Sequence, residues 1–331
     1  MGVLERARAH LRRRRALAKR TALEVAKLWT RIDRNDIARS WAASVPAAVT
    51  VVESGQAIAA AQASGYLDDL LEDFGLSVGA APRVRIDGFV GTAADGRDLA
   101  TLLFRPAITA LQTIRAAPTV DRQVVAKAMA SGRFVSDLIV GTEVSDAGRA
   151  ADQAALAAET QLDGWVRMLN LPSCARCIQL AGQFYRWNSG FERHPGDDCV
   201  HIPATEDAAD DLTTDPMKAF ESLTEAEQNR LFTEAGAQAI RDGADLNQVV
   251  NSRRGMTTVG ETKTRVREDG RTVNVSIRRQ TTTRVAGRDI LTTREGAGRR
   301  VRLMPAQIYK EANGNREEAL RLLRLHGYLL L

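Results

Sequence analysis

The chain has 331 residues, of which 44% are hydrophobic, 26% charged and only 5% aromatic. This length suggests about two domains and allows a sizeable core without disulfides. The low aromatic content, with recurrent Ala, Leu and Arg, favours packed helices over a β-sandwich. No run of 18 apolar residues occurs and the first twenty residues lack an apolar segment, so we expect neither a membrane span nor a secretory leader.

Positive charge is concentrated in two segments. The net charge is +5, but residues 1–20 carry +7 and residues 253–302 carry +9, which leaves −11 on the rest of the chain. Two basic segments on an acidic body suggest an anionic partner, with nucleic acid first and an acidic protein surface second. A charge-rich, solvated surface is an equally simple interpretation.

Helical periodicity dominates the first 80 residues. Residues 3–44 are predicted to form one or two long helices, which Pro46 ends or restarts, and residues 51–74 form another with Gly75 as its cap. The four arginines at 12–15 cover one helical turn with positive charge, so they are the first candidates for contact with nucleic acid: Arg12, Arg13, Arg14 and Arg15.

Glycine and proline punctuate residues 79–98, which predicts a loop or a short strand pair and a boundary near residue 80. Helical periodicity returns at 99–114, 120–130 and 134–162. Interruptions are expected at Pro106 and Pro118.

After a dense, irregular stretch at 165–203, turn and cap signals predict further helices. Asp215-Pro216 leads into one helix, and Ser222 or Thr224 caps a second that runs to about Gly243.

Beyond Gly255 the pattern changes to alternating β-branched residues. Residues 262–267 and 271–278, joined by Glu268-Asp269-Gly270, predict a β-hairpin. Its faces are rich in Arg and Thr, so we expect a projecting basic arm, followed by a helical tail from Met304. The arm supplies further candidates for nucleic-acid contact: Arg265, Arg267, Arg278 and Arg279.

All three cysteines lie close together in the sequence, interleaved with two histidines in the order Cys-x2-Cys-x16-His-x4-Cys-x-His. A Cys-x2-Cys turn directs two sulfur atoms to one point, and Zn²⁺ prefers four S or N ligands in a tetrahedron. The spacing therefore predicts a structural zinc site among Cys174, Cys177, His194, Cys199 and His201. Buried free thiols and a redox pair remain alternatives.

The stretch "WVRMLNLPSCARCIQLAGQFYRWNSGFERHPGDDCVHIPA" resembles the signature region of the phage Mu F-like minor head proteins, in the branch found in tailed phages of actinobacteria. The segments "LFTEAGAQAIRDGADLNQVVNSRRGM" and "RLMPAQIYKEANGNREEALRLLRLHGYLL" are similar to the same branch, so the resemblance covers most of residues 80–331. Asp197 stands where the family pattern has a cysteine, so this chain has one thiolate fewer. The pattern is matched in order by Arg167, Cys174, Cys177, Leu180, Gly182, Tyr185, Trp187, Asn188, Phe191, His194, Pro195, Cys199 and Pro203.

The resemblance implies a minor structural protein of a tailed-phage virion that acts in head assembly near the portal and inner capsid. It implies portal, major capsid or scaffold proteins as partners, and a location in the capsid interior or at the portal vertex after assembly in the host cytoplasm. The basic segments would suit sequence-independent contact with packaged DNA.

Members of the branch are sometimes labelled capsid maturation proteases, so protease or assembly-factor activity is one alternative. A non-virion DNA-binding accessory protein is another. The sequence has no Gly-x-Ser-x-Gly, His-Glu-x-x-His or phosphate-loop motif. A dyad of Cys199 or Cys177 with His194 is conceivable. His10 and His326 lie in predicted helix ends, where a solvated role is expected.

The predicted fold is mainly α, with a small α+β Mu F-like core, long basic N-terminal helices and a projecting basic β-hairpin. The expected regions are basic helices at 1–80, the Mu F-like core with the Cys/His cluster at 81–210, a helical segment at 211–256, the hairpin arm at 257–302 and the helical tail at 303–331.

Overall fold

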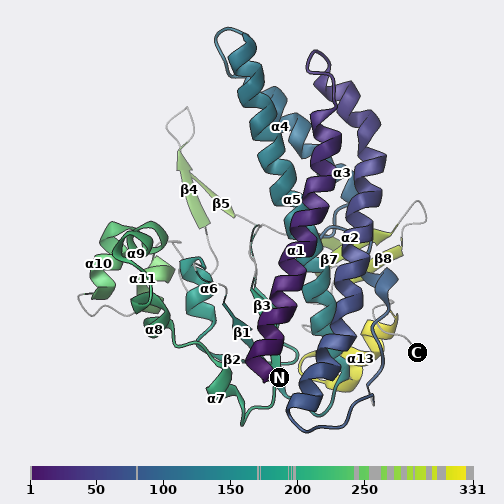
Figure 1. Ribbon diagram of the computed structural model, residues 1–331, viewed down its shortest axis with the longest axis vertical. Coiled ribbons are helices and arrows are strands. Elements are labelled where there is room, and N and C mark those ends of the chain that lie inside the picture. The colour runs from purple at the N-terminus through teal and green to yellow at the C-terminus, as the bar shows by residue number, and fades with distance from the viewer. Residues whose placement is uncertain are drawn as a thin grey trace.

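Four helices form the main body of the molecule and lie side by side along its long axis (Figure 1). The computed structural model describes residues 2–79, 81–169, 171, 173–192, 194, 196, 199–241, 246–252, 262–266, 272–276, 282–285, 288–295, 300–303 and 311–325. The four helices are α1 (Val3–Thr30), α2 (Ile37–Asp73), α4 (Arg105–Arg115) and α5 (Arg122–Ala158). None of the helices in the described part has the length and hydropathy needed to cross a membrane.

Helix α2 continues through Pro46, so the predicted stop at this proline is wrong. A proline inside a helix removes one hydrogen bond and costs about 3 kcal/mol. Val45 and Ala48 on either side are buried, and their packing offsets that loss. The predicted cap at Gly75 is confirmed: its φ is +70°, and the N–H groups of Gly75 and Leu76 donate to carbonyls of the last helical turn.

The chain between α2 and α5 contains only short elements before α4. The stretch 79–98 forms a 3₁₀ turn, η1 (Ile86–Phe89), and an isolated bridge between Thr92 and Asp98. A short helix, α3 (Leu99–Leu103), precedes α4, whose first turn holds Pro106 as expected. The two helices predicted at 120–130 and 134–162 are one continuous helix, α5, which begins where the Asp121 side chain accepts from the Val124 N–H.

A three-stranded antiparallel sheet packs against this helical body. It consists of β1 (Gly164–Met168), β2 (Phe184–Arg186) and β3 (Val200–Ala204), in the order β2-β1-β3. The central strand pairs Val166 with both Phe184 and Ile202. A short helix, α6 (Ala175–Leu180), lies between the first two strands in sequence, and α7 (Ala209–Leu212) follows the third.

Four short helices follow and form a smaller core with α6: α8 (Pro216–Glu221), α9 (Glu225–Phe232), α10 (Glu234–Arg241) and α11 (Leu246–Ser252). The predicted caps are confirmed, since Asp215 caps α8, and Thr224 with Glu227 forms a capping box at α9. The helix expected to run to Gly243 is divided at Thr233, whose φ is +67°.

The predicted hairpin is present as β4 (Thr262–Val266) and β5 (Thr272–Ser276), paired antiparallel. A further sheet was not predicted: β6 (Thr282–Val285), β7 (Arg288–Glu295) and β8 (Arg300–Leu303), in the order β6-β7-β8. The predicted helical tail contains α13 (Arg316–Leu325).

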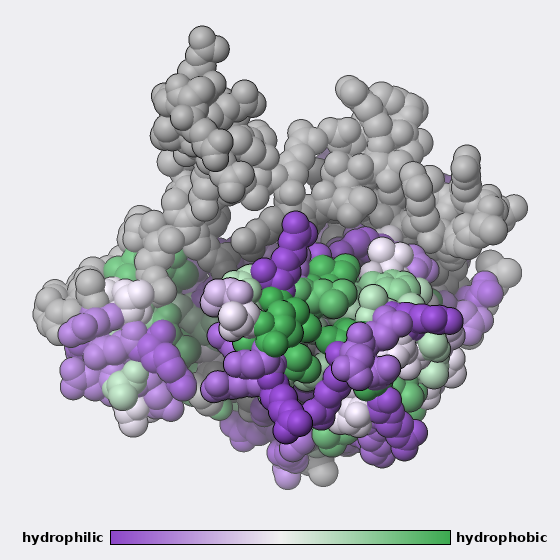
Figure 2. All heavy atoms as spheres, turned by 90° about the horizontal axis from the view of Figure 1, so that it is seen from above, coloured by the Kyte–Doolittle hydropathy of each residue, from purple (hydrophilic) through white to green (hydrophobic). Residues whose placement is uncertain are grey.

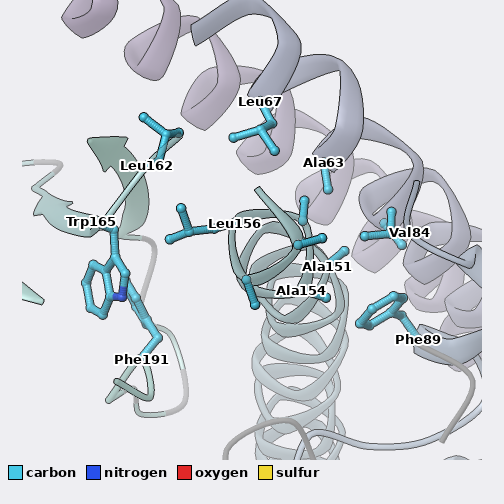
Figure 3. Close-up of a cluster of buried hydrophobic side chains, with 14 of the residues drawn as sticks. Ala63, Leu67, Val84, Phe89, Ala151, Ala154, Leu156, Leu162, Trp165 and Phe191 are labelled. Atoms are coloured by element: carbon cyan, nitrogen blue, oxygen red, sulfur yellow. The ribbon is translucent and has the colours of Figure 1, made fainter. Parts of the chain in front are cut away.

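The principal core cluster joins segments from most of the chain, as Figure 3 shows around the end of α5. Ala151 and Ala154 of α5 face Ala63 and Leu67 of α2, and small side chains allow the two helices to lie close together. The cluster extends from Ala60 to Leu322, so the boundary predicted near residue 80 does not divide the core. The predicted class, mainly α with a small antiparallel sheet, is confirmed at that level.

Candidate metal site and buried charges

The cysteine pair of the predicted zinc site lies at the start of α6. Cys174 is the residue that caps this helix, and its Sγ accepts from the Cys177 N–H at 3.4 Å. The Nε2 atom of His194 lies 3.1 Å from the Cys174 Sγ and 3.9 Å from the Cys177 Sγ. A helix start and a loop 20 residues later in the chain therefore bring three donor atoms to one point, all within 4.8 Å of one another.

The surroundings of Cys174 favour its thiolate. A hydrogen bond from the Cys177 side chain is the largest influence, and His194 and the Cys177 N–H act in the same direction. Against the opposing effect of burial, they lower the pKa of Cys174 to about 4. The thiolate is the form that binds a metal ion or attacks an electrophile.

These three donors fit a tetrahedral zinc ion. Bond lengths of about 2.3 Å to sulfur and 2.0 Å to nitrogen place ligand atoms roughly 3.5–3.8 Å apart. The distances from the two thiols to His194 bracket this range. Three ligands leave one position of the tetrahedron to water or to another residue, and Asp197 lies outside the described residues.

Cys199 and His201 do not belong to this group, so their prediction as metal ligands is wrong. Cys199 is buried in the principal core, and its carbonyl accepts from the Arg149 Nε at 2.7 Å. The His201 ring lies between Trp165 and Phe191, with ring centroids 4.6 Å and 4.3 Å away. Cys199, just before β3, and His201, within β3, are both fully buried, and this burial overrides their proximity to Cys177 in the sequence.

Arginines fix the loop that carries His194. The guanidinium of Arg167, on β1, lies 3.8 Å from the Phe191 ring centroid and donates to the Glu192 carbonyl. Arg176, on α6, forms an ion pair with the Glu192 carboxylate. The loop is thus attached to both β1 and α6 next to His194.

A second cluster of charged groups is fully buried between α1, α2 and α5. Arg14 is 2% exposed and donates to both carboxylate oxygens of Asp152, at 2.6 and 3.1 Å. The His10 Nε2 lies 3.4 Å from the same carboxylate, and its ring stacks on Tyr66 at 3.8 Å. The prediction of Arg14 as a nucleic-acid contact and the expected solvation of His10 are therefore both wrong.

The charges in this cluster support one another. Burial opposes ionisation of Asp152, but the charge of Arg14 and the hydrogen bonds from His10 and Arg14 hold its pKa well below the usual range. Burial, with the Arg14 charge, lowers the pKa of His10, although Asp152 acts in the opposite direction. The cluster therefore contains an ion pair beside a neutral histidine at neutral pH, which suits a structural element.

The remaining predicted nucleic-acid contacts divide into two groups. Arg12, Arg13 and Arg15 are exposed on α1. Arg265 lies in β4, but its side chain is outside the described part of the structure, as are the residues Arg267, Arg278 and Arg279.

Comparison of the chain with protein-family models, with curated proteins and with solved structures gives no match.

Proposed function

We propose that this chain is a minor structural protein of a tailed-phage head, in which Cys174, Cys177 and His194 hold a structural zinc ion. The observation that carries the proposal is that the residues of the Mu F-like signature serve as scaffold. Cys174, Cys177 and His194 converge at α6, and Trp165 and Phe191 pack into the core.

Zinc at this site would tie α6 to the loop at His194, which are 20 residues apart in the chain. The cluster lies beside α8–α11 through the contacts of α6, so the ion would stabilise the junction between the two cores. Structural zinc sites contribute directly to the free energy of folding.

Zinc content tests the site. Purified chain should contain about one zinc per molecule, and Cys174→Ser should lose it together with thermal stability. Cys199→Ala is the matched control, because this cysteine is buried outside the group and its replacement should leave zinc content unchanged. Zinc content below about one-tenth per wild-type chain after refolding with zinc would contradict the assignment.

A thiol protease is the second candidate, because Cys174 and His194 are 3.1 Å apart and Cys174 favours the thiolate. Iodoacetamide distinguishes the two. A zinc-bound Cys174 should be protected until a chelator is added, whereas a catalytic thiol should react at once. Cleavage of the major capsid protein that Cys174→Ala abolishes would favour the protease.

Quantitative mass spectrometry of purified phage particles tests the role in the virion. We expect the intact chain at low copy number relative to the major capsid protein. Its absence from particles, together with a trimmed capsid protein, would favour a protease or assembly factor.

Contact with packaged DNA would involve the exposed arginines of α1. Replacing Arg12, Arg13 and Arg15 with glutamine should weaken DNA binding and reduce its salt dependence by about one counterion for each phosphate that is no longer neutralised. Arg14 is left unchanged because it is buried. If DNA binding by this variant at low salt equals that of the wild type, the exposed arginines of α1 have a role other than contact with DNA.

A further inference from the structure

Helix α4 has two apolar faces, and only one of them is covered. Phe104, Ile108 and Leu111 are 38%, 38% and 40% exposed, and their spacing of four and three residues places them along one side of the helix. The adjoining part of the helix surface holds Pro106, Ala107 and Ala110, which are buried, and α4 packs against α5. An ordinary surface helix carries polar residues where α4 has this second stripe.

The charges on α4 and in the first turns of α5 are almost all positive. Arg105 and Arg115 lie on α4, and Arg122 and Lys127 lie on the first turns of α5. All four are exposed, and none forms an ion pair within the described part of the chain. Between Leu99 and Arg133 the sequence has a single acidic residue, Asp121.

Asp121 caps α5 through the Val124 N–H, and its single negative charge offsets only one of these four cations. Val120, in the same loop, is 63% exposed. Figure 2 views the molecule from this end and shows hydrophobic residues gathered near the centre of the bundle, with hydrophilic residues around them. The α4–α5 end of the bundle thus combines exposed apolar side chains with four exposed cations on the same two helices.

We propose that the stripe of Phe104, Ile108 and Leu111 binds an amphipathic helix of a partner protein that is rich in Asp and Glu. Apolar residues of that helix at positions i, i+3 or i+4 and i+7 would cover the stripe. Its carboxylates would meet the cations of α4 and α5, which gives both affinity and orientation.

Nucleic acid fits this surface less well than an acidic helix. Phosphates would neutralise the cations but would leave three large apolar side chains in water. An apolar helix face removes them from water.

A second copy of this chain is also a poor occupant. Its acidic residues at 206–211 include only the four-residue helix α7, which is too short to cover the stripe. A second acidic stretch is the end of α2, where Arg6 pairs with Asp69, Glu72 and Asp73, and Arg83 pairs with Asp68. The leucines of that stretch are buried, so it offers neither free carboxylates nor apolar side chains.

Selection of peptides from a random library of 16-residue sequences against the full chain tests the proposal. We expect enrichment of acidic sequences with apolar residues at helical spacing. The double variant Ile108→Gln/Leu111→Gln should weaken binding of an enriched peptide at least about tenfold. Leu23→Gln on α1, which alters a side chain 47% exposed, is the matched control and should change affinity less than about twofold.

The charge contribution is tested separately with Arg115→Gln/Arg122→Gln, which should weaken the same peptide and reduce the salt dependence of its binding. Arg12→Gln on α1 is the control for charge. All of these side chains are exposed, so thermal melting should remain that of the wild type.

Three results would overturn the proposal. One is the absence of enrichment over beads without the chain, and another is enrichment of basic or patternless sequences. The third is tight binding of a DNA duplex that Arg115→Gln/Arg122→Gln abolishes and Ile108→Gln/Leu111→Gln leaves intact. None of these outcomes depends on zinc or on particles, so the inference stands or fails separately from the proposed function.

Discussion

At the scale of single residues, Arg14 and Gly148 form a complementary pair. A Cβ atom at position 148 would overlap the guanidinium of Arg14, which lies across α5 at this point. Gly148 weakens the helix by about 1 kcal/mol relative to alanine. In return, the guanidinium reaches Asp152 through the space that a side chain would fill.

Breaking the buried ion pair should destabilise the protein strongly. Asp152→Asn removes the charge that compensates Arg14, and loss of one partner of a buried pair costs about 3–5 kcal/mol. Urea denaturation measures this loss. Glu24→Gln, in an exposed pair with Lys27, is the control and should change stability by less than about 1 kcal/mol. If the two substitutions lowered the free energy of unfolding equally, the buried Arg14–Asp152 pair would contribute no more to stability than an exposed pair.

Stability should fall as the pH is lowered from 7 to 5. Burial lowers the pKa of His201 well below its usual value, and neither ring nitrogen has a hydrogen-bond partner in the described structure. The unfolded state therefore binds protons that the folded state does not. A histidine that stays neutral over this range contributes a loss of about 2 kcal/mol.

The variant His201→Phe isolates this contribution. Its stability should depend less steeply on pH than that of the wild type, because the titrating group is gone. Chemical denaturation at several pH values measures both slopes. Parallel curves would mean that the His201 environment admits the charged ring.

The sequence contains a signal for the burial of Arg14, although it is easily missed. Arg14 lies three residues after Leu11 and four before Ala18, and so falls on the same apolar stripe of α1. Its partner Asp152 is 138 residues away, and no single-sequence pattern connects them. The Cys174–Cys177–His194 group was predictable because cysteine is rare and the spacing is short. Whether Cys199 and His201 join this group depends on the direction in which their side chains point, and the spacing of residues in the sequence does not encode that direction.

At the scale of secondary structure, α5 depends on where its glycines face. Gly132 lies against the Trp29 ring and the Pro106 carbonyl, whereas nothing lies within 4 Å of a Cβ placed at Gly141. Close packing therefore requires a glycine at position 132 of α5, whereas position 141 of the same helix has room for a side chain.

Alanine at these two positions should have opposite effects. Gly132→Ala should destabilise by about 1–3 kcal/mol, since the Trp29 ring must move. Gly141→Ala on the same helix should stabilise by about 0.5–1 kcal/mol through helix propensity. Thermal or urea unfolding of both variants gives the comparison. Stabilisation by both would mean that Trp29 yields at little cost.

Helix identity was easier to predict than helix length. The periodic stretches around α1, α2 and α5 were recognised, but the helices predicted at 120–130 and 134–162 are a single one. The predicted end or restart of a helix at Pro46 is wrong, because the packing of α2 on both sides of this residue outweighs the lost backbone hydrogen bond. The strands β6, β7 and β8 lack a turn signal as clear as Glu268-Asp269-Gly270.

At the scale of the whole molecule, the Arg316 side chain adds hydrogen bonds to the apolar packing of α13 against the end of α5. Arg316 donates to the carbonyls of Leu156 and Ala157 in the last turn of α5, both at 3.1 Å. Its guanidinium also lies 4.9 Å from the Trp187 ring centroid. The positive charge at a helix C-terminus is favourable as well.

Removing this attachment should cost more than removing a neighbouring arginine. Arg316→Ala should destabilise by about 2–3 kcal/mol, because several charged hydrogen bonds disappear. Arg321→Ala, on the exposed side of the same helix, should cost less than about 1 kcal/mol. Both values come from urea denaturation, and similar losses would contradict a special role for Arg316.

The packing of α13 on α5 also means that the principal core cannot be completed until the last part of the chain has been synthesised. The core that begins at Ala60 includes Ala319 and Leu322, which the ribosome adds some 250 residues later. Until then, the surface that they cover on α5 stays open to water, chaperones and proteases. An interrupted chain that ends before α13 would therefore expose part of its apolar core and be more open to proteolysis than the full chain.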